Sequence, residues 1–237
     1  MIQRFSNRIK KGWAGLALLS VELIIILVVF ILSLIAFIFI TRNVFILKDE
    51  QFDYKVFTFL ESYVNSSRNN VMLFFTFLGT HLFLIPANIL LIIYFLFIKK
   101  HRWYSIKIPV IALTSLALMF ILKNFFGRQR PDIPLIKEVH GLSFPSGHAL
   151  MSVTFYGLLI HIVWNTVKRK WLKWTLIVLL VLLILIIGFT RIYLRVHYPS
   201  DVFAGFATGF LWLVTSLWVV KKLEQYSKRK AVRVVEP

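Results

Sequence analysis

The sequence has no cysteine among its 237 residues, which excludes disulfide bonds, thiolate metal sites and cysteine nucleophiles. It also lacks an internal repeat, a low-complexity tract and any linker long enough to separate domains. No two histidines have the His-x3-His spacing that a helical zinc site often uses, so neither a metal nor another cofactor is expected. A single domain over residues 1–237 is therefore predicted.

Acidic residues are scarce: 10 Asp and Glu stand against 28 Lys and Arg, and the formal net charge is +18. In a soluble protein this excess would suggest nucleic-acid binding. Here the basic residues lie between long apolar runs rather than along one face, and 59% of the chain is hydrophobic. Soluble domains are about 45–50% apolar. The composition therefore indicates a membrane protein whose charge reflects its topology, and nucleic acid is not an expected partner.

Six segments are long and apolar enough to cross a bilayer, since a helix needs about 20 mostly apolar residues to do so. The first apolar run, from about Gly12 to Ile40, is much longer than the core of a cleavable signal peptide and has no cleavage site after it. It is predicted to be retained, and the fold class is all-α, an integral membrane bundle of six transmembrane helices. The predicted spans are about 17–40, 71–98, 106–124, 149–167, 172–190 and 202–220.

The Lys and Arg residues of the connections predict how these spans are oriented. The N-terminus, the connections 99–107 and 168–173 and the C-terminal tail hold 18 of the basic residues, and the opposite set of connections holds 10. Because cytoplasmic connections carry the excess of Lys and Arg, both termini are predicted to be cytoplasmic. The connections 41–70, 123–148 and 191–201 are then extracytoplasmic.

The first of these extracytoplasmic connections contains apolar side chains among its charges, within residues 42–70. Their spacing allows a short amphipathic helix on the membrane surface, where it would shape lipid access. An ordinary interfacial connector explains the same pattern and is the simpler interpretation.

Three groups of polar residues lie in the predicted extracytoplasmic connections. They are Lys-Asn-Phe-Phe-Gly-Arg-Gln-Arg-Pro from Lys123 to Pro131, Phe-Pro-Ser-Gly-His from Phe144 to His148, and the run from Thr190 to Asp201. The order of the spans and the count of basic residues make no use of the chemistry of these groups, yet they place all three on one face of the membrane. That agreement predicts a single site.

Positive charge is the first chemical feature of this predicted site. Lys123, Arg130 and Arg191 offer three cations at the membrane surface. Arg presents a planar fork that matches phosphate oxygens, and Lys presents a point charge. The proline before Ser146 suits the first turn of a helix, so the free amides near Ser146 and Gly147 would point at an anion. Such a pocket would hold a phosphate and stabilise a phosphoryl-transfer transition state.

Two histidines complete the predicted chemistry. Without cysteine, a nucleophile must be His, Ser, Thr or a carboxylate. His197 and Asp201 are four residues apart, so Asp201 could accept a hydrogen bond from one ring nitrogen and leave the other to attack phosphorus. His148 would protonate the leaving oxygen and then activate the water that hydrolyses the phosphohistidine.

Lys-x6-Arg-Pro, Pro-Ser-Gly-His and Arg-x5-His-x3-Asp, in this order, resemble the three signature motifs of the type 2 phosphatidic acid phosphatase (PAP2) family. The resemblance covers about residues 50–220 and includes the six spans of the family's membrane branch. It implies a metal-free phosphohistidine mechanism with His197 as nucleophile, Asp201 as its partner and His148 as acid and base. Thr190 departs from the family, which usually has Ser there. The residues to which the resemblance assigns phosphate binding are Lys123, Arg130, Arg191, Ser146 and Gly147.

The resemblance further implies a multi-pass protein of the cell membrane whose site faces the extracytoplasmic side. Its substrate would be a phosphorylated membrane lipid: phosphatidylglycerophosphate, phosphatidic acid or undecaprenyl pyrophosphate. Two alternatives stay open, a phosphotransferase that uses an alcohol acceptor and a non-catalytic lipid transporter. Arg128, Arg195 and Lys137 fit no motif position and are interpreted as surface or headgroup contacts.

Overall fold

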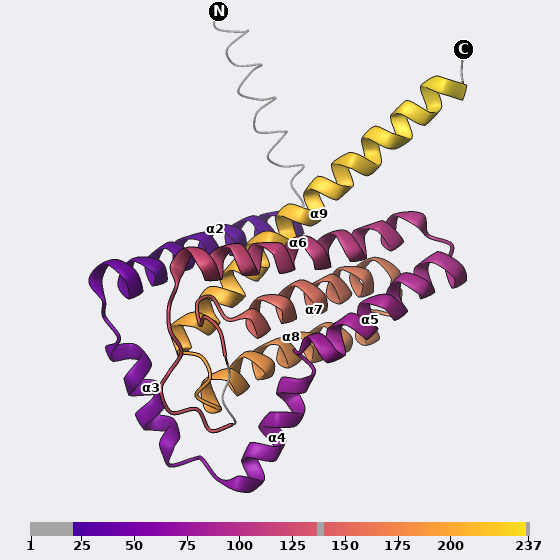
Figure 1. Cartoon of the computed structure of the whole chain (residues 1–237). Helices are drawn as coiled ribbons and strands as arrows, with labels where there is room; N and C mark the ends of the chain where they lie inside the picture. The colour runs from indigo at the N-terminus through magenta and orange to yellow at the C-terminus, as the bar shows by residue number, and fades with distance from the viewer. Residues whose placement is uncertain (1–20, 137–139, 236–237) are drawn as a thin grey trace, which may run out of the picture.

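The computed structural model describes residues 21–136 and 140–235, which form helices joined by short connections (Figure 1). Each of the six predicted spans overlaps a helical segment long and apolar enough to cross a membrane, which confirms the all-α, six-span prediction. The first predicted span starts at residue 17, so its beginning lies outside the described residues. The membrane-crossing segments are Leu23–Leu47, Ser67–Ile98, Arg102–Phe126, Gly147–Thr166, Lys170–Tyr193 and Pro199–Arg229.

The last helix is much longer than a bilayer requires. It has 37 residues, and at 1.5 Å per residue its length is about 55 Å, against about 30 Å of hydrocarbon. Figure 1 shows its C-terminal turns reaching beyond the other helices. In chain order the elements are α2 (Val21–Thr41), the π-helical turn η1 (Arg42–Leu47), α3 (Gln51–Glu61), α4 (Ser66–Phe77), α5 (His81–Ile93), the π-helical turn η2 (Tyr94–Ile98), α6 (Arg102–Phe126), α7 (Gly147–Thr166), α8 (Lys170–Tyr193) and α9 (Pro199–Val235).

Helix α7 lies inside the bundle and packs against α6, α8 and α9. Ile108 of α6, Leu158 of α7 and Leu213 of α9 belong to one buried cluster. Helix α2, by contrast, turns large apolar side chains outward along its whole length, as a helix in contact with lipid does. The inner position of α7 matters for the site, because α7 begins within the Pro-Ser-Gly-His motif.

Two glycines one turn apart bring α9 close to α7. A Cβ atom at Gly205 would lie 2.7 Å from the carbonyl oxygen of Ser146, and one at Gly209 would lie 2.8 Å from that of Leu150. Small residues four apart allow membrane helices to approach this closely. The contact fixes the start of α7 at Ser146 against the start of α9, which carries Asp201.

The second predicted span is broken rather than continuous. Helix α4 ends at Phe77 and α5 begins at His81, and the hydroxyl of Tyr156 donates to the carbonyl oxygen of Leu78 in the gap, at 2.8 Å. A Cβ at Gly79 would lie 3.1 Å from the ring of His148. The break therefore brings the chain against one of the predicted catalytic residues.

Of the two interpretations of residues 42–70, the helical one is correct. Helix α3 forms over Gln51–Glu61 and lies across the end of the bundle that holds the motifs (Figure 1). Phe57 is buried from α3 in a cluster with Ala149, Ile192 and Val202. A simple connector would not bury these side chains, and α3 is instead packed as part of the bundle.

Candidate active site

The three predicted motifs meet at one end of the bundle. The backbone N–H of Ser143 donates to the carbonyl oxygen of Arg128 at 2.8 Å, and that of Ser146 donates to the carbonyl oxygen of Asp201 at 2.9 Å. These bonds join the connection between α6 and α7 to the start of α9. The predicted site residues that lie at this end are Lys123, Arg130, Ser146, Gly147, His148, Arg191, His197 and Asp201.

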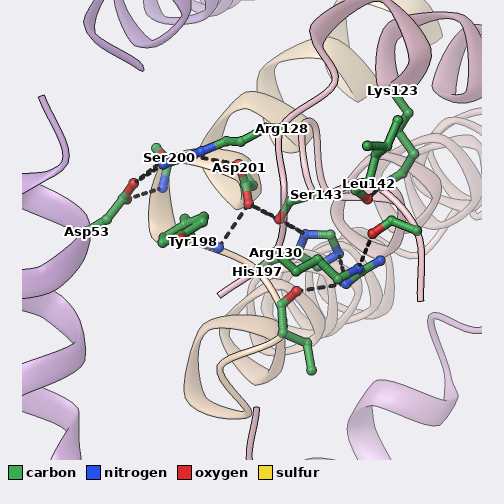
Figure 2. Close-up of polar contacts among 12 residues, drawn as sticks. Asp53, Lys123, Arg128, Arg130, Leu142, Ser143, His197, Tyr198, Ser200 and Asp201 are labelled. Carbon is green, nitrogen blue, oxygen red and sulfur yellow. Dashed lines mark hydrogen bonds and ion pairs between the residues drawn. The ribbon is translucent and has the colours of Figure 1, made fainter. Parts of the chain in front are cut away.

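His197 is buried, with 1% of its surface exposed, and both of its ring nitrogens have polar neighbours (Figure 2). Nε2 lies 3.3 Å from Nη1 of Arg130. Nδ1 lies 3.1 Å from Oγ of Ser143 and 3.6 Å from the nearer carboxylate oxygen of Asp201. The expected direct hydrogen bond between His197 and Asp201 is therefore absent, and the Ser143 hydroxyl lies in its place.

The reason lies in where α9 begins. His197 precedes the helix, so its side chain does not stack over that of Asp201 as two residues four apart would within a helix. Oδ2 of Asp201 instead accepts from the backbone N–H of Tyr198 at 2.9 Å and from the hydroxyl of Ser143. The carboxylate thus closes the first turn of α9 and contacts the imidazole through a serine.

These contacts define the tautomer of His197. An ionised carboxylate only accepts hydrogen bonds, so Ser143 gives its one hydroxyl proton to Asp201. The Ser143 oxygen must then accept the hydrogen bond from Nδ1–H of His197. Nε2 is left without a proton, and its lone pair points towards Arg130.

Three cations lie close enough to His197 to act on its charge: Lys123, Arg130 and Arg191, called the pocket cations below. Arg130 donates to the carbonyl oxygens of Gly141 and Val196, at 2.8 and 2.7 Å. Within the described residues none of the pocket cations forms an ion pair with a carboxylate. Their charge is therefore available to an anion. Lys123 donates from Nζ to the carbonyl oxygen of Leu142, and Arg191 donates from Nη1 to Oγ1 of Thr76 at 2.6 Å.

Three buried polar atoms of this region have no hydrogen-bond partner: Oγ of Ser146, Nε2 of His148 and Nε of Arg191. Buried polar atoms are rarely left unpaired, because each one costs about 1–3 kcal/mol. Gly147 lies between Ser146 and His148 in the chain, and a Cβ atom there would lie 2.6 Å from the sulfur of Met119. A bound anion with several oxygens would accept hydrogen bonds from these groups. It would also neutralise the charge of the pocket cations, which have no carboxylate partner among the described residues.

Burial and charge both act on His197. Burial lowers the pKa of its imidazole well below the ordinary value, and the neighbouring Arg130, Arg191 and Lys123 lower it further. Burial likewise lowers the pKa of Arg130. His197 is therefore neutral at neutral pH, which is the form that a nucleophilic imidazole needs.

Arg128 is not the surface residue that the sequence analysis predicts. It is buried, and its Nη1 donates to Oδ1 of Asp201 at 2.8 Å while its Nη2 donates to Oδ2 of Asp53 at 2.9 Å. Its guanidinium lies over the ring of Tyr198, 4.0 Å from the ring centre. Burial acts to lower the pKa of Arg128, but Asp201 and Asp53 outweigh it and raise the pKa. Arg128 is thus a permanent buried cation beside the site.

The other motif-free residues and Thr190 have simpler positions. Arg195 is partly buried rather than at the surface, and its Nη2 lies 3.5 Å from the exposed carboxylate of Glu61. Lys137 falls outside the described residues. Thr190 is buried and donates to the carbonyl oxygen of Ile187 in its own helix, at 2.6 Å. Its hydroxyl is therefore used within α8. No group of three or more His, Cys, Asp or Glu among the described residues is placed to hold a metal ion.

A six-helix membrane bundle with a buried imidazole beside unpaired cations defines a class of membrane phosphatases, and the comparison with known families agrees. The chain belongs to the PAP2 superfamily, whose family model matches residues 104–225. It is 30% identical over 167 residues to phosphatidylglycerophosphatase B of Bacillus subtilis, a match that covers 68% of this chain and 77% of that protein. It is 26% identical over 189 residues to an undecaprenyl-diphosphatase of Sulfolobus acidocaldarius, covering 75% and 85% of the two chains.

Solved structures have the same fold. The crystal structure of a transmembrane PAP2-type phosphatidylglycerolphosphate phosphatase from Bacillus subtilis matches with a TM-score of 0.73 and 23% identity, over 83% of this chain and 96% of that one. The crystal structure of Aquifex aeolicus LpxE matches with a TM-score of 0.54 and 27% identity, over 69% and 93%. This chain is therefore a multi-pass membrane protein of a lipid phosphatase family.

Proposed function

We propose that this protein removes phosphate from a phosphomonoester or pyrophosphate lipid through a phosphohistidine on His197. The observation that carries the proposal is the placement of the buried His197 ring, with Nδ1 3.1 Å from Oγ of Ser143 and Nε2 3.3 Å from Nη1 of Arg130. Because Ser143 donates to Asp201, these contacts favour a proton on Nδ1 and a free lone pair on Nε2. A neutral imidazole nitrogen next to anion-binding groups is suited to attack phosphorus. The pocket cations would hold the phosphate in front of it.

In the first step the lone pair of Nε2 attacks phosphorus. An Nε2–P bond forms while the bond from phosphorus to the lipid oxygen breaks, and the electron pair of that bond goes to the lipid oxygen. His148, protonated beside the negative charge of the bound phosphate, gives this oxygen one proton and becomes neutral. The positive charge that develops on the ring of His197 is stabilised by Asp201 through the hydroxyl of Ser143.

In the second step water attacks the phosphohistidine. His148, now without its proton, takes one from the water as the new O–P bond forms. The Nε2–P bond breaks, its electron pair returns to Nε2, and inorganic phosphate leaves. Water would reach phosphorus from the side of Lys123, Arg130 and His148, which are partly exposed, whereas Arg191 and His197 are buried.

Phosphatidylglycerophosphate and undecaprenyl pyrophosphate are the favoured substrates. The names of two relatives support them, a phosphatidylglycerophosphatase and an undecaprenyl-diphosphatase, and phosphatidic acid has the same phosphomonoester. The excess of Lys and Arg in the opposite connections supports an extracytoplasmic site. The pocket cations supply the charge that the transition state needs, so the mechanism requires no metal.

The test is a comparison of His197→Ala with His140→Ala, which alters an exposed histidine. Both variants and the wild type are purified in detergent and given phosphatidic acid labelled with ³²P in its phosphate. His197→Ala should release no phosphate and trap no alkali-stable phosphoprotein, and both properties should survive in His140→Ala. Wild-type turnover in folded His197→Ala would reject the nucleophile. Addition of an alcohol, followed by product analysis, distinguishes hydrolysis from phosphotransfer.

A further inference from the structure

Helix α3 contributes a buried carboxylate to the far side of the active site. Asp53 has 1% of its surface exposed, and its two oxygens accept three hydrogen bonds, two from Ser200 and one from Arg128 (Figure 2). The backbone N–H of Ser200 donates to Oδ1 of Asp53 at 2.8 Å, and the Ser200 hydroxyl donates to Oδ2 at 2.6 Å. Arg128 gives Nη2 at 2.9 Å. A carboxylate this deeply buried is stable only with such full pairing.

Asp53 fixes the position of Arg128. The guanidinium is held on one edge by Asp53 through Nη2, and on the other edge Nη1 reaches Oγ of Ser200 and Oδ1 of Asp201, at 2.7 and 2.8 Å. The ring of Tyr198 covers its face. A planar guanidinium held at both edges and on its face has one orientation.

Arg128 in turn sets the orientation of Asp201. Nη1 of Arg128 donates to Oδ1 of Asp201. The other oxygen, Oδ2, therefore faces Ser143 and the backbone N–H of Tyr198 and accepts from both. Through Ser143 that oxygen acts on Nδ1 of His197. Without Arg128, Oδ1 would lose its partner, and only the hydrogen bonds from Ser143 and the backbone N–H of Tyr198 would orient the carboxylate.

We infer that Asp53 is a positioning residue of the active site, which acts through Arg128 on Asp201 and makes α3 a part of the catalytic apparatus. This inference rests on the proposed function of His197. Asp53 lies outside residues 104–225, which the family model matches, and it belongs to none of the sequence motifs.

Helix α3 has other anchors, so the charge of Asp53 can be removed without releasing the helix. Phe57 packs in the cluster formed with Ala149 and Val202, and the exposed Glu61 pairs with Arg195. Glu61→Gln is therefore a matched control: it removes a carboxylate and an ion pair from the same helix, away from Arg128.

The experiment measures kcat and KM for phosphate release from phosphatidic acid in mixed micelles, normalised to folded protein by thermal unfolding. Asp53→Asn should lower kcat at least about tenfold, because small misplacements of catalytic groups cost up to about 100-fold, and should leave KM nearly unchanged. Glu61→Gln should match the wild type. Ser200→Ala, which removes one contact of Asp53, should give a smaller loss in kcat and provides the readout if Asp53→Asn does not fold.

A double-mutant cycle separates positioning from a merely structural role. In single turnovers with enzyme in excess, Asp53→Asn should have almost no further effect once Asp201→Asn is present, because the path to His197 is already cut. An equal loss in both backgrounds, or wild-type kcat in folded Asp53→Asn, would overturn the inference. Activity in His197→Ala would instead reject the proposed function, so the two failures are distinguishable.

Discussion

The hydroxyl oxygen of Ser143 lies 3.1 Å from Nδ1 of His197. The same hydroxyl donates to Asp201, so a neutral serine joins a carboxylate and an imidazole that are 3.6 Å apart. A single hydroxyl therefore determines which ring nitrogen is protonated and which one is free to react.

Removal of this hydroxyl should impair catalysis more than binding. Ser143→Ala takes away the acceptor of Nδ1–H and is expected to lower kcat about tenfold or more. The loss should not exceed the range of about 10²–10⁴-fold that proton-transfer groups contribute, because Ser143 acts only through His197. Ser143→Thr keeps the hydroxyl and should recover most of the rate. Steady-state kinetics on both variants measure this, and an unchanged kcat in Ser143→Ala would show that Asp201 reaches His197 by another path.

The pH dependence should follow the charge around His197. Its lowered pKa keeps the imidazole neutral, so kcat/KM should persist as the pH falls below the ordinary histidine value of about 6.5. Arg130→Met removes a cation that lowers this pKa, so the pKa rises and the acid limb of kcat/KM moves to higher pH. Arg195→Met removes a cation that is paired with Glu61 and is not among the charges that act on His197, so it should leave the limb in place. Equal movement in both variants would contradict the assignment.

Phosphate release should survive an excess of chelator, because the pocket cations carry the charge that a metal would otherwise supply. Orthovanadate should inhibit as a mimic of the phosphoryl group, and its inhibition should weaken in Arg191→Met, since Nε of Arg191 is one of the unpaired buried donors. Inhibition curves for the two proteins measure this. Loss of activity on chelation, with recovery on addition of a divalent ion, would instead indicate a metal mechanism.

The absence of native cysteine makes the orientation directly testable, since each introduced thiol is unique. Ile133, exposed in the connection between α6 and α7, and Lys222, near the end of the last span, lie at opposite ends of the bundle. In intact cells a membrane-impermeant maleimide should label Ile133→Cys but not Lys222→Cys until the membrane is permeabilised. The reverse pattern would place the site in the cytoplasm.

Close packing of α9 against α7 should limit what Gly205 tolerates. Its added methyl would lie 2.7 Å from the carbonyl oxygen of Ser146, so Gly205→Ala should destabilise the protein by about 1–3 kcal/mol and reduce turnover by displacing the motif. Thr215→Val changes an exposed position of the same helix and serves as the control. Thermal unfolding in detergent compares the two, and equal stability would mean that the helices can separate without cost.

The residues that the sequence analysis predicted share a property: each belongs to a dense local pattern. Asp53 does not, because its partners lie 75 and 147 residues away. Arg128 stands two residues before a motif arginine, and only its burial distinguishes it from a surface cation. The local sequence gives no signal for a pairing that depends on how distant segments pack.

The break at Gly79 was missed for a different reason. Hydropathy sums composition over a window, and residues 71–98 are mostly apolar, so the sum does not register a change of direction. The sequence shows that residue 79 is a glycine, but it does not show that Ile187 and His148 pack against that position. Helix content and span number, which depend on composition and period alone, were predictable.

The residues of the buried network around Arg128 are far apart in the sequence, so they are synthesised at different times. Ser200 and Asp201 open the last helix, whereas Asp53 and Arg128 are synthesised far earlier. At about 5–20 residues per second, a nascent chain spends seconds with those early charges in place and their final partners still unmade. A polypeptide interrupted before its sixth membrane span lacks Asp201, so under the proposed mechanism it would release no phosphate.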